Sequence, residues 1–230
     1  GVAAIDFPYA QFKTSISQAI WNLGNRKITM TKPENVALEN SYFYSTREEL
    51  DSLAFNGNQA EYDIDSLKLY IQGIPYIKVA DALITPESNE ITIYENSRIG
   101  TLENTTVVID TVNRYHTMID GTIDIKSRNK FLGDATYQFV NARSDTFRIK
   151  FGNFELVEDE SRRRSRDLYT VSAGNVTEED NLIISPGMIF KGEATMYAIK
   201  QPLELEGEVK LDFKNIENYN TWIKYYSNEE

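Results

Sequence analysis

The residues of this chain that could carry acid–base or metal chemistry are its carboxylates and a single histidine. The chain has no cysteine, which excludes a thiol nucleophile, a disulfide and a thiolate metal site. Its one histidine, His116, cannot form a multi-histidine zinc site, and a lone histidine gives little support to a Ser–His–Asp triad. We interpret His116 as a strand or turn residue.

Paired carboxylates offer a second kind of chemistry. The stretch Asp63-Ile-Asp65 brings two carboxylates together, and Asp120-Gly-Thr-Ile-Asp124 brings another two. Two facing carboxyl groups can serve as the acid and the nucleophile of a glycosidase, and carboxylates that meet in loops can hold calcium. With 35 acidic residues, however, such pairs are expected by chance, and the calcium-loop pattern Asp-x-Asp-x-Asp-Gly is absent.

Other catalytic and nucleotide-binding motifs are also missing from the sequence. Gly-x-Ser-x-Gly, His-Glu-x-x-His and Gly-x-Gly-x-x-Gly do not occur. The spacing of Gly187 and Gly192 imitates the beginning of a P-loop, but Glu193 stands where the lysine is required, and its carboxylate would repel phosphate. The sequence therefore predicts that the protein is not an enzyme and has no catalytic residue, no metal site and no cofactor.

Three similar stretches supply the residues that we single out instead. They are Phe55, Gly57 and Tyr62, then Phe131, Gly133 and Tyr137, then Phe190, Gly192 and Tyr197. In the second stretch these residues recur at period two, so they share one strand face, on which the small residues leave room for a neighbouring ring. The other two stretches have one extra residue between Phe and Tyr, which predicts a β-bulge or a strand end. We interpret all these residues as packing positions of a structural β repeat.

Composition and charge limit the classes of function. The 230 residues are 41% hydrophobic and 12% aromatic, which is enough for a packed core. The net charge of −11 argues against binding to a nucleic-acid backbone and against attraction to an anionic membrane surface. No apolar run approaches the ~20 residues of a transmembrane helix, so we expect no transmembrane segment in this chain. Because the chain begins with Gly1, we expect a processed chain or a fragment of a larger protein.

Three segments have helical patterns. Between Pro8 and Leu23, apolar residues recur at spacings of three and four, which predicts an amphipathic helix packed on a sheet. Residues 46–49 have the form of a capping box and predict a short helix. Apolar residues at helical spacing predict a short C-terminal helix over 214–230.

The rest of the chain alternates in hydrophobicity between turn signals, which predicts short strands. We expect them over 27–31, 58–63, 67–72, 75–80, 90–94, 105–110, 121–126, 132–140, 145–151, 153–157, 168–172, 181–184, 189–199 and 203–213. The predicted fold is mainly β, an antiparallel β-repeat scaffold of the β-sandwich, β-taco or solenoid-like type. We expect a helical N-terminal segment over 1–54, a β-repeat domain over 55–213 with a candidate sub-boundary in loop 158–167, and the C-terminal helix over 214–230.

Part of the β region resembles a known family. The stretches Ala60-Glu-Tyr62, Leu69-Tyr-Ile71-Gln-Gly73-Ile and Ala80-Asp81-Ala-Leu-Ile84 resemble the OstA-type repeats of lipopolysaccharide-transport proteins. The stretch from Ile119 to Gly133 is similar to segments of large exported repeat proteins of Gram-negative bacteria. The resemblance spans residues 55–213 and rests on short motifs, and no binding residue transfers from it. It implies a β-taco or β-jelly-roll scaffold in the envelope, with an apolar groove for lipid or an extended structural role.

These observations support one leading hypothesis and two alternatives. We expect a non-enzymatic structural or binding module of a larger bacterial cell-envelope or surface protein, exported to the periplasm or cell surface of a Gram-negative organism, that acts through protein or lipid contacts. One alternative is a carbohydrate-binding β-sandwich, because the chain has 14 tyrosines and exposed rings can stack on sugars. Another is a lipid carrier with a groove lined by Phe131, Tyr137, Phe190 and Tyr197. The expected partners are envelope proteins, lipids or glycans, and not nucleic acid; the oligomeric state stays open.

Overall fold

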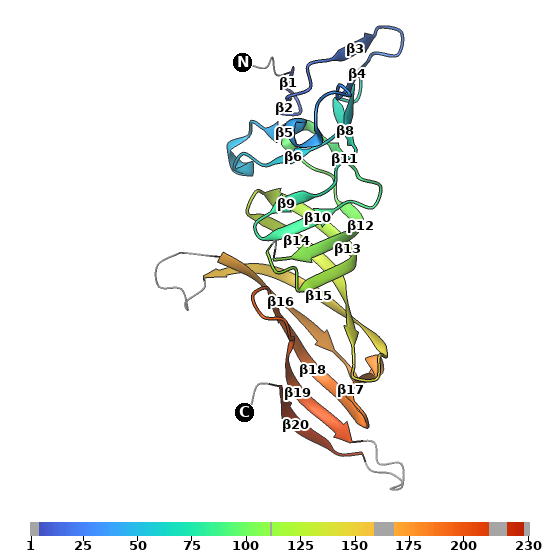
Figure 1. Cartoon of the computed structure of the whole chain (residues 1–230), viewed down its shortest axis with the longest axis vertical. Helices are drawn as coiled ribbons and strands as arrows, with labels where there is room; N and C mark the ends of the chain where they lie inside the picture. Colours follow the sequence, from blue (N-terminus) through green and yellow to red (C-terminus); the bar gives the residue numbers. More distant parts are fainter. Residues whose placement is uncertain (1–4, 111, 159–167, 212–219, 228–230) are drawn as a thin grey trace.

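The computed structural model describes residues 5–110, 112–158, 168–211 and 220–227. Figure 1 shows an elongated molecule of β-strands that runs from β1 at one end to β20 near the other. The strands form three open sheets, which confirms the predicted mainly antiparallel β fold. The helical segments among the described residues are four short 3₁₀ turns, η1 (Leu38–Asn40), η2 (Glu48–Leu50), η3 (Glu95–Ser97) and η4 (Glu178–Asp180).

Two small sheets form the N-terminal half of the molecule. The first has the order β1-β2-β5-β6, with β1 at Ile5–Phe7, β2 at Phe12–Thr14, β5 at Tyr42–Ser45 and β6 at Ala54–Asn56. The second has the order β11-β8-β7-β4-β3, with β3 at Ala19–Asn22, β4 at Lys27–Thr31, β7 at Gln59–Asp63, β8 at Lys68–Gln72 and β11 at Glu90–Ile93. Strands from both sides of the expected boundary at residue 55 pair within each sheet, so the boundary does not separate two structural units.

One long antiparallel sheet forms the rest of the molecule. Its order is β20-β19-β18-β16-β15-β14-β13-β12-β10-β9, and β17 pairs with β18 beside this path. Its strands are β9 (Ile77–Val79), β10 (Ala82–Thr85), β12 (Leu102–Ile109), β13 (His116–Ser127), β14 (Lys130–Val140), β15 (Thr146–Glu158), β16 (Leu168–Val176), β17 (Leu182–Ser185), β18 (Met188–Tyr197), β19 (Glu204–Leu211) and β20 (Trp222–Tyr226). Most neighbours in the chain are neighbours in the sheet, which is the topology that short turns favour.

The predicted helix over residues 8–23 is wrong, because these residues lie in and around β1, β2 and β3. Phe12 and Ile16 are buried, but β2 alternates between buried and half-buried residues, as a strand does. Ile20 and Leu23, which belong to the expected apolar helix face, are exposed. A spacing of four residues fits both a helix face and a strand face, so the pattern could not distinguish the two periods.

The other two helix predictions also fail where the structure describes them. The capping-box sequence at residues 46–49 leads only into the short turn η2. Residues 222–226 of the expected C-terminal helix form strand β20, which pairs with β19; 214–219 and 228–230 lie outside the described residues. The candidate sub-boundary in loop 158–167 lies outside the described residues except for Glu158, which ends β15.

The long sheet curls, so that strands far apart in its order contact each other. The backbone N–H of Thr170, in β16, donates to the Asp81 carboxylate at the turn between β9 and β10, with an N···O distance of 2.8 Å, and the Thr170 hydroxyl donates to the same carboxylate. At the beginning of β13, Nε2 of His116 lies 2.7 Å from the carbonyl oxygen of Lys200, just beyond β18. The interior that these contacts enclose is apolar and includes the fully buried Met118 and Phe151.

Candidate functional site

The C-terminal half of the long sheet has one face built almost wholly from apolar side chains. Residues directly opposite each other in paired strands share a face. Three rows of such partners cross β16 to β20, namely Gly174–Ala194–Leu205, Val176–Gly192–Gly207–Tyr225 and Leu182–Phe190–Val209–Ile223. On the adjoining strands, Tyr137 faces Ile149 and Phe139 faces Phe147. These pairings place the rings of β14 and β15 beside the rows.

We call this surface the apolar face. Its members are Tyr137, Phe139, Phe147, Ile149, Phe151, Val176, Leu182, Ile184, Met188, Phe190, Ala194, Met196, Leu205, Val209, Ile223 and Tyr225. No charged side chain belongs to it among the described residues. An antiparallel sheet commonly has one such apolar face, which packs against a core, and one polar face in water.

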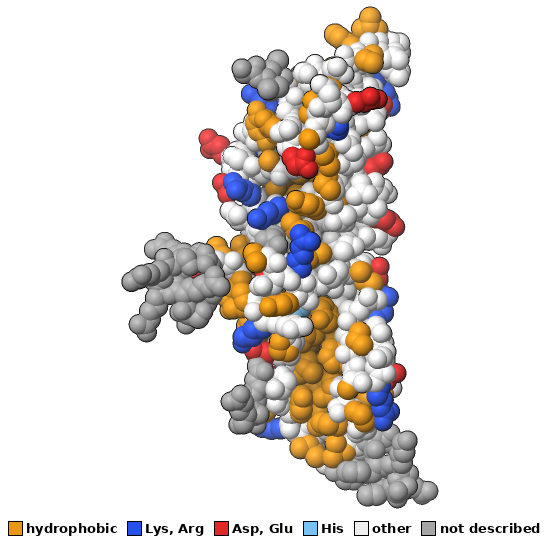
Figure 2. Space-filling model, in the orientation of Figure 1, with side chains coloured by type: hydrophobic (Ala, Val, Ile, Leu, Met, Phe, Trp, Pro, Cys, Tyr) orange, Lys and Arg blue, Asp and Glu red, His pale blue; other side chains and the backbone are white. Residues whose placement is uncertain are grey.

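The apolar face is only partly covered. Its centre is packed, and Phe190 and Phe151 are fully buried. Toward its margin, Phe139, Phe147 and Met188 are only half-buried, and Ile223 is 45% exposed. Figure 2 shows hydrophobic side chains gathered in a hollow on the C-terminal half of the molecule. Within the described part of the chain, the interior of this half is therefore open on one side.

The opposite face of the same strands is polar. The Lys191 ammonium lies 3.1 Å from the Glu208 carboxylate and 4.1 Å from the ring centroid of Trp222. Lys210 donates to Glu178 at 2.7 Å, and this hydrogen bond lowers the pKa of the Glu178 carboxyl. The sheet is thus strongly amphipathic, with a charged outer face and an inner face that carries no charge.

The nine residues singled out from the sequence are divided among the three sheets. Phe131 and Tyr137 lie in β14, and Phe190 lies in β18, all on the inner side of the long sheet. Tyr197 lies on the outer face of β18. Four residues were expected to line a lipid groove, and two of them, Tyr137 and Phe190, belong to the apolar face. Phe131, near the beginning of β14, is buried against Phe154 of β15. Tyr197 lies on the outer face.

The first stretch of the repeat does not form one strand. Phe55 lies in β6 of the first sheet and Tyr62 in β7 of the second, with Gly57 between them, so a strand end separates the two rings as predicted. The slip predicted in the third stretch is wrong, because β18 pairs with β16 and β19 without a register shift. Tyr197 simply points to the other side of an uninterrupted strand.

The carboxylate pairs have structural partners. The Asp63 carboxylate accepts hydrogen bonds from the backbone N–H groups of Asp65 and Ser66, and these bonds lower its pKa. Asp120 forms an ion pair with Arg148. Within the described residues, no group of three or more His, Asp or Glu side chains is arranged to hold a metal ion.

His116 is fully buried, and its surroundings resemble a packing position more than an acid–base site. Nε2 lies 2.7 Å from the Lys200 carbonyl oxygen and 3.2 Å from that of Tyr197, so it donates to both in the neutral ring. Nδ1 has no hydrogen-bond partner among the described residues. Burial lowers the pKa of this imidazole. No carboxylate in the described part of the chain hydrogen-bonds to the ring.

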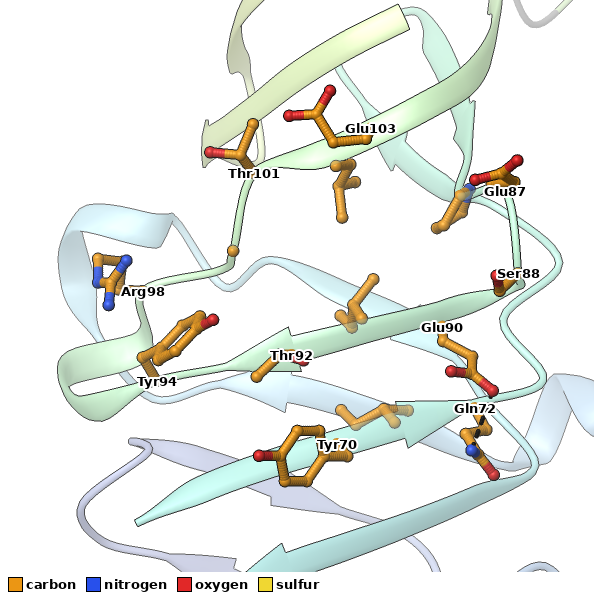
Figure 3. Close-up of a pocket in the computed structure, with 15 residues that line it drawn as sticks. Tyr70, Gln72, Glu87, Ser88, Glu90, Thr92, Tyr94, Arg98, Thr101 and Glu103 are labelled. Carbon is orange, nitrogen blue, oxygen red and sulfur yellow. Dashed lines mark hydrogen bonds between the residues drawn. The ribbon is translucent and has the colours of Figure 1, made fainter. Parts of the chain in front are cut away.

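A second candidate site is a polar pocket between β8, β11 and β12, with a volume of about 590 Å³ (Figure 3). Tyr70 faces Thr92 across β8 and β11, and Gln72 donates to Glu90 at 3.0 Å. The Tyr70 ring lies beside these polar groups. An aromatic ring next to amide, carboxyl and hydroxyl groups is an arrangement that can bind a sugar.

Comparison of the chain with protein-family models, curated proteins and solved structures finds no match. Among the described residues, no helix is long and apolar enough to cross a membrane. The assignment of a function therefore depends on the two surfaces described above.

Several residues of the apolar face were not identified from the sequence, notably Val176, Met188 and Ile223. The alternation of Leu205 and Val209 with charged residues in β19 marks one face of that strand as apolar. Nothing in that alternation tells whether a second layer covers the face, because this depends on the curl of the whole sheet.

Proposed function

We propose that this protein is a non-enzymatic binding module of a larger bacterial envelope protein and that its apolar face holds the acyl chain of a lipid. The observation that carries the proposal is the combination of an uncharged sheet face with an open side. The resemblance of short motifs to lipopolysaccharide-transport repeats supports the same assignment, with the periplasm or the cell surface as the proposed location.

The absence of charge on the apolar face favours a hydrocarbon ligand over a protein ligand. Protein interfaces usually have a polar rim and carry several hydrogen bonds, and both need polar groups on each side. A hydrocarbon chain needs none, and burying about ten methylene groups would contribute roughly 8 kcal/mol before the entropic cost of binding. Half-buried rings such as Phe139 and Phe147 offer such a chain contacts along its length.

Two neighbouring residues of β18 provide a matched test. Met188 is half-buried on the apolar face, whereas Ile189 is half-buried on the outer face, opposite Lys210. Titration with cis-parinaric acid, a fluorescent fatty acid, measures binding of an acyl chain directly. Met188→Glu puts a carboxylate into the apolar face and should weaken binding by about tenfold or more, a loss of ~1.4 kcal/mol. Ile189→Glu should leave the affinity unchanged.

Thermal unfolding of both variants is the control that tests whether each variant still folds. The proposal is wrong if the unchanged protein binds no fatty acid, or if both variants bind as tightly as it does. A loss of binding in both variants would also contradict the proposal, because the outer face would then contribute as much to fatty-acid binding as the apolar face.

A carbohydrate ligand is the second candidate, and the polar pocket around Tyr70 favours it. Stacking of a sugar on an aromatic ring is lost when the ring is removed. Tyr70→Ala should therefore abolish signals on a glycan array, whereas Tyr115→Ala, which removes an exposed ring far along the chain, should not. An array on which the unchanged protein gives no signal would exclude this candidate.

A further inference from the structure

The β3–β4 hairpin carries the most concentrated group of exposed apolar side chains near the N-terminal end of the molecule. Ile20 is 75% exposed, Trp21 63% and Leu23 74%. In Figure 1 the hairpin projects at the end of the elongated molecule, and Figure 2 shows hydrophobic side chains at this tip. Exposed tryptophan together with large aliphatic residues marks a surface that contacts something other than water.

These side chains point in opposite directions. Ile20 and Trp21 are consecutive residues of β3, so their side chains lie on opposite faces of the hairpin. Among the described residues, β3 is the last strand of its sheet and pairs only with β4, and all four residues of β3 are exposed. A flat protein partner would cover one face of this hairpin and leave the other in water. A surrounding medium would cover both faces.

Strand β3 and the first three residues of the turn carry no charged side chain. Residues 14–25 contain no Lys, Arg, Asp or Glu, and residues 7–33 contain no acidic residue, although the chain has 35 of them. At the turn of the hairpin, Arg26 lies 2.7 Å from Asp65, and Lys27, the first residue of β4, lies 2.6 Å from Glu61. The nearest cations are therefore neutralised within the protein. With these charges paired, the exposed apolar side chains can meet an uncharged lipid surface despite the net charge of −11.

We propose that the β3–β4 hairpin inserts its tip into the interface of a lipid bilayer. The interfacial region surrounds both faces of the hairpin, and tryptophan is favoured there because its ring is apolar and its N–H can still bond to water or headgroups. The unpaired backbone groups along the edge of β3 also find water at this depth, which they would lack in the hydrocarbon core. The proposal does not depend on the apolar face, which lies in the other half of the molecule.

Binding of the whole protein to vesicles of phosphatidylcholine, alone or mixed with phosphatidylglycerol, tests the proposal. In a Trp222→Phe background, Trp21 is the only tryptophan and reports on its own surroundings. We expect co-sedimentation with both kinds of vesicle, a blue shift of the Trp21 emission and quenching by lipids brominated near the headgroup. Because the two cations at the turn are paired with carboxylates, the affinity should change less than about threefold with salt or with phosphatidylglycerol.

The matched variants are Ile20→Ser combined with Leu23→Ser, and Val112→Ser as the control, since Val112 is 83% exposed elsewhere. The double variant should lose binding by about tenfold or more, and the control should not. Met188→Glu should bind vesicles normally, so failure of this proposal and failure of the proposed acyl-chain site are distinguishable.

Four results would overturn the proposal, and the first three concern vesicle binding. They are no binding to either vesicle, equal binding by the double variant, and binding that needs phosphatidylglycerol and disappears with salt. A fourth is self-association of the unchanged protein in solution that the double variant abolishes, because the hairpin would then join two copies of this chain.

Discussion

Gly133 in β14 and Gly192 in β18 have the same backbone conformation and the same kind of neighbour. Their φ angles are +134° and +143°, a region that residues with a side chain rarely adopt. A Cβ at Gly133 would overlap the carbonyl oxygen of Thr122 in β13, and one at Gly192 would overlap that of Glu206 in β19. The second and third Phe-x-Gly stretches therefore share a close approach of two strand backbones.

Substitution of either glycine should destabilise the protein strongly. Gly133→Ala and Gly192→Ala should each lower the free energy of unfolding by ~3 kcal/mol, because backbone strain and overlap with the partner strand add together. Gly152→Ala is the control, since its Cβ would be 3.6 Å from the nearest atom, the carbonyl oxygen of Gly133. Urea denaturation measures all three. Losses that are small, or no larger than that of the control, would show that the glycines are not packing positions.

The pH dependence of stability should contain a contribution from His116. Its pKa is lowered in the folded protein, mainly by burial, although the carbonyl groups of Lys200 and Tyr197 and the charge of Asp110 act in the opposite direction. Below about pH 6.5 the unfolded chain binds a proton that the folded protein does not bind. The free energy of unfolding should therefore fall as the pH is lowered through this region, with a slope of at most ~1.4 kcal/mol per pH unit from this one group.

Because His116 is the only histidine, its ring protons can be followed by NMR without assignment of the whole chain. Their titration midpoint in the folded protein should lie below the ordinary histidine value. His116→Gln should remove this part of the slope whatever its effect on stability at neutral pH. A normal titration near pH ~6.5 would contradict the buried, neutral ring.

The contact between Asp81 and Thr170 should hold the curl of the long sheet. Asp81→Ala leaves the buried Thr170 N–H and hydroxyl without their acceptor and should lower the free energy of unfolding by ~2 kcal/mol. Thr170→Val removes one of the two bonds and should have a smaller effect. In a double-mutant cycle the two losses should not add, because both changes act on one contact. Glu95→Ala, which removes an exposed carboxylate, serves as the control; additive losses would argue against a shared contact.

The strands of the long sheet could be predicted because their patterns are long. The expected strands over 132–140 and 203–213 overlap β14 and β19 closely, since period-two alternation continues there over many residues. In the N-terminal half, β1, β2 and β3 have only three or four residues each, too few for an alternation to be recognised. Pairing with distant strands, such as β2 with β5, decides their structure.

The candidate sites were less accessible to sequence analysis. The inward positions of Phe190 and Val209 follow from local alternation, but the openness of the apolar face depends on how the whole sheet curls. The exposed tip of the β3–β4 hairpin could not be predicted from the sequence for a related reason. Ile20 and Leu23 fit an apolar helix face, and only the strand conformation places them in solvent.

Photolabelling with a fatty acid that carries a diazirine on its chain tests the central claim most directly. After irradiation and proteolysis, mass spectrometry identifies the labelled residues. The proposed acyl-chain site predicts labels on the margin of the apolar face, at residues such as Phe139, Met188 and Tyr225, and loss of these labels when unmodified fatty acid competes. Labels confined to the outer face or to the β3–β4 hairpin, or labels that do not respond to competition, would contradict it.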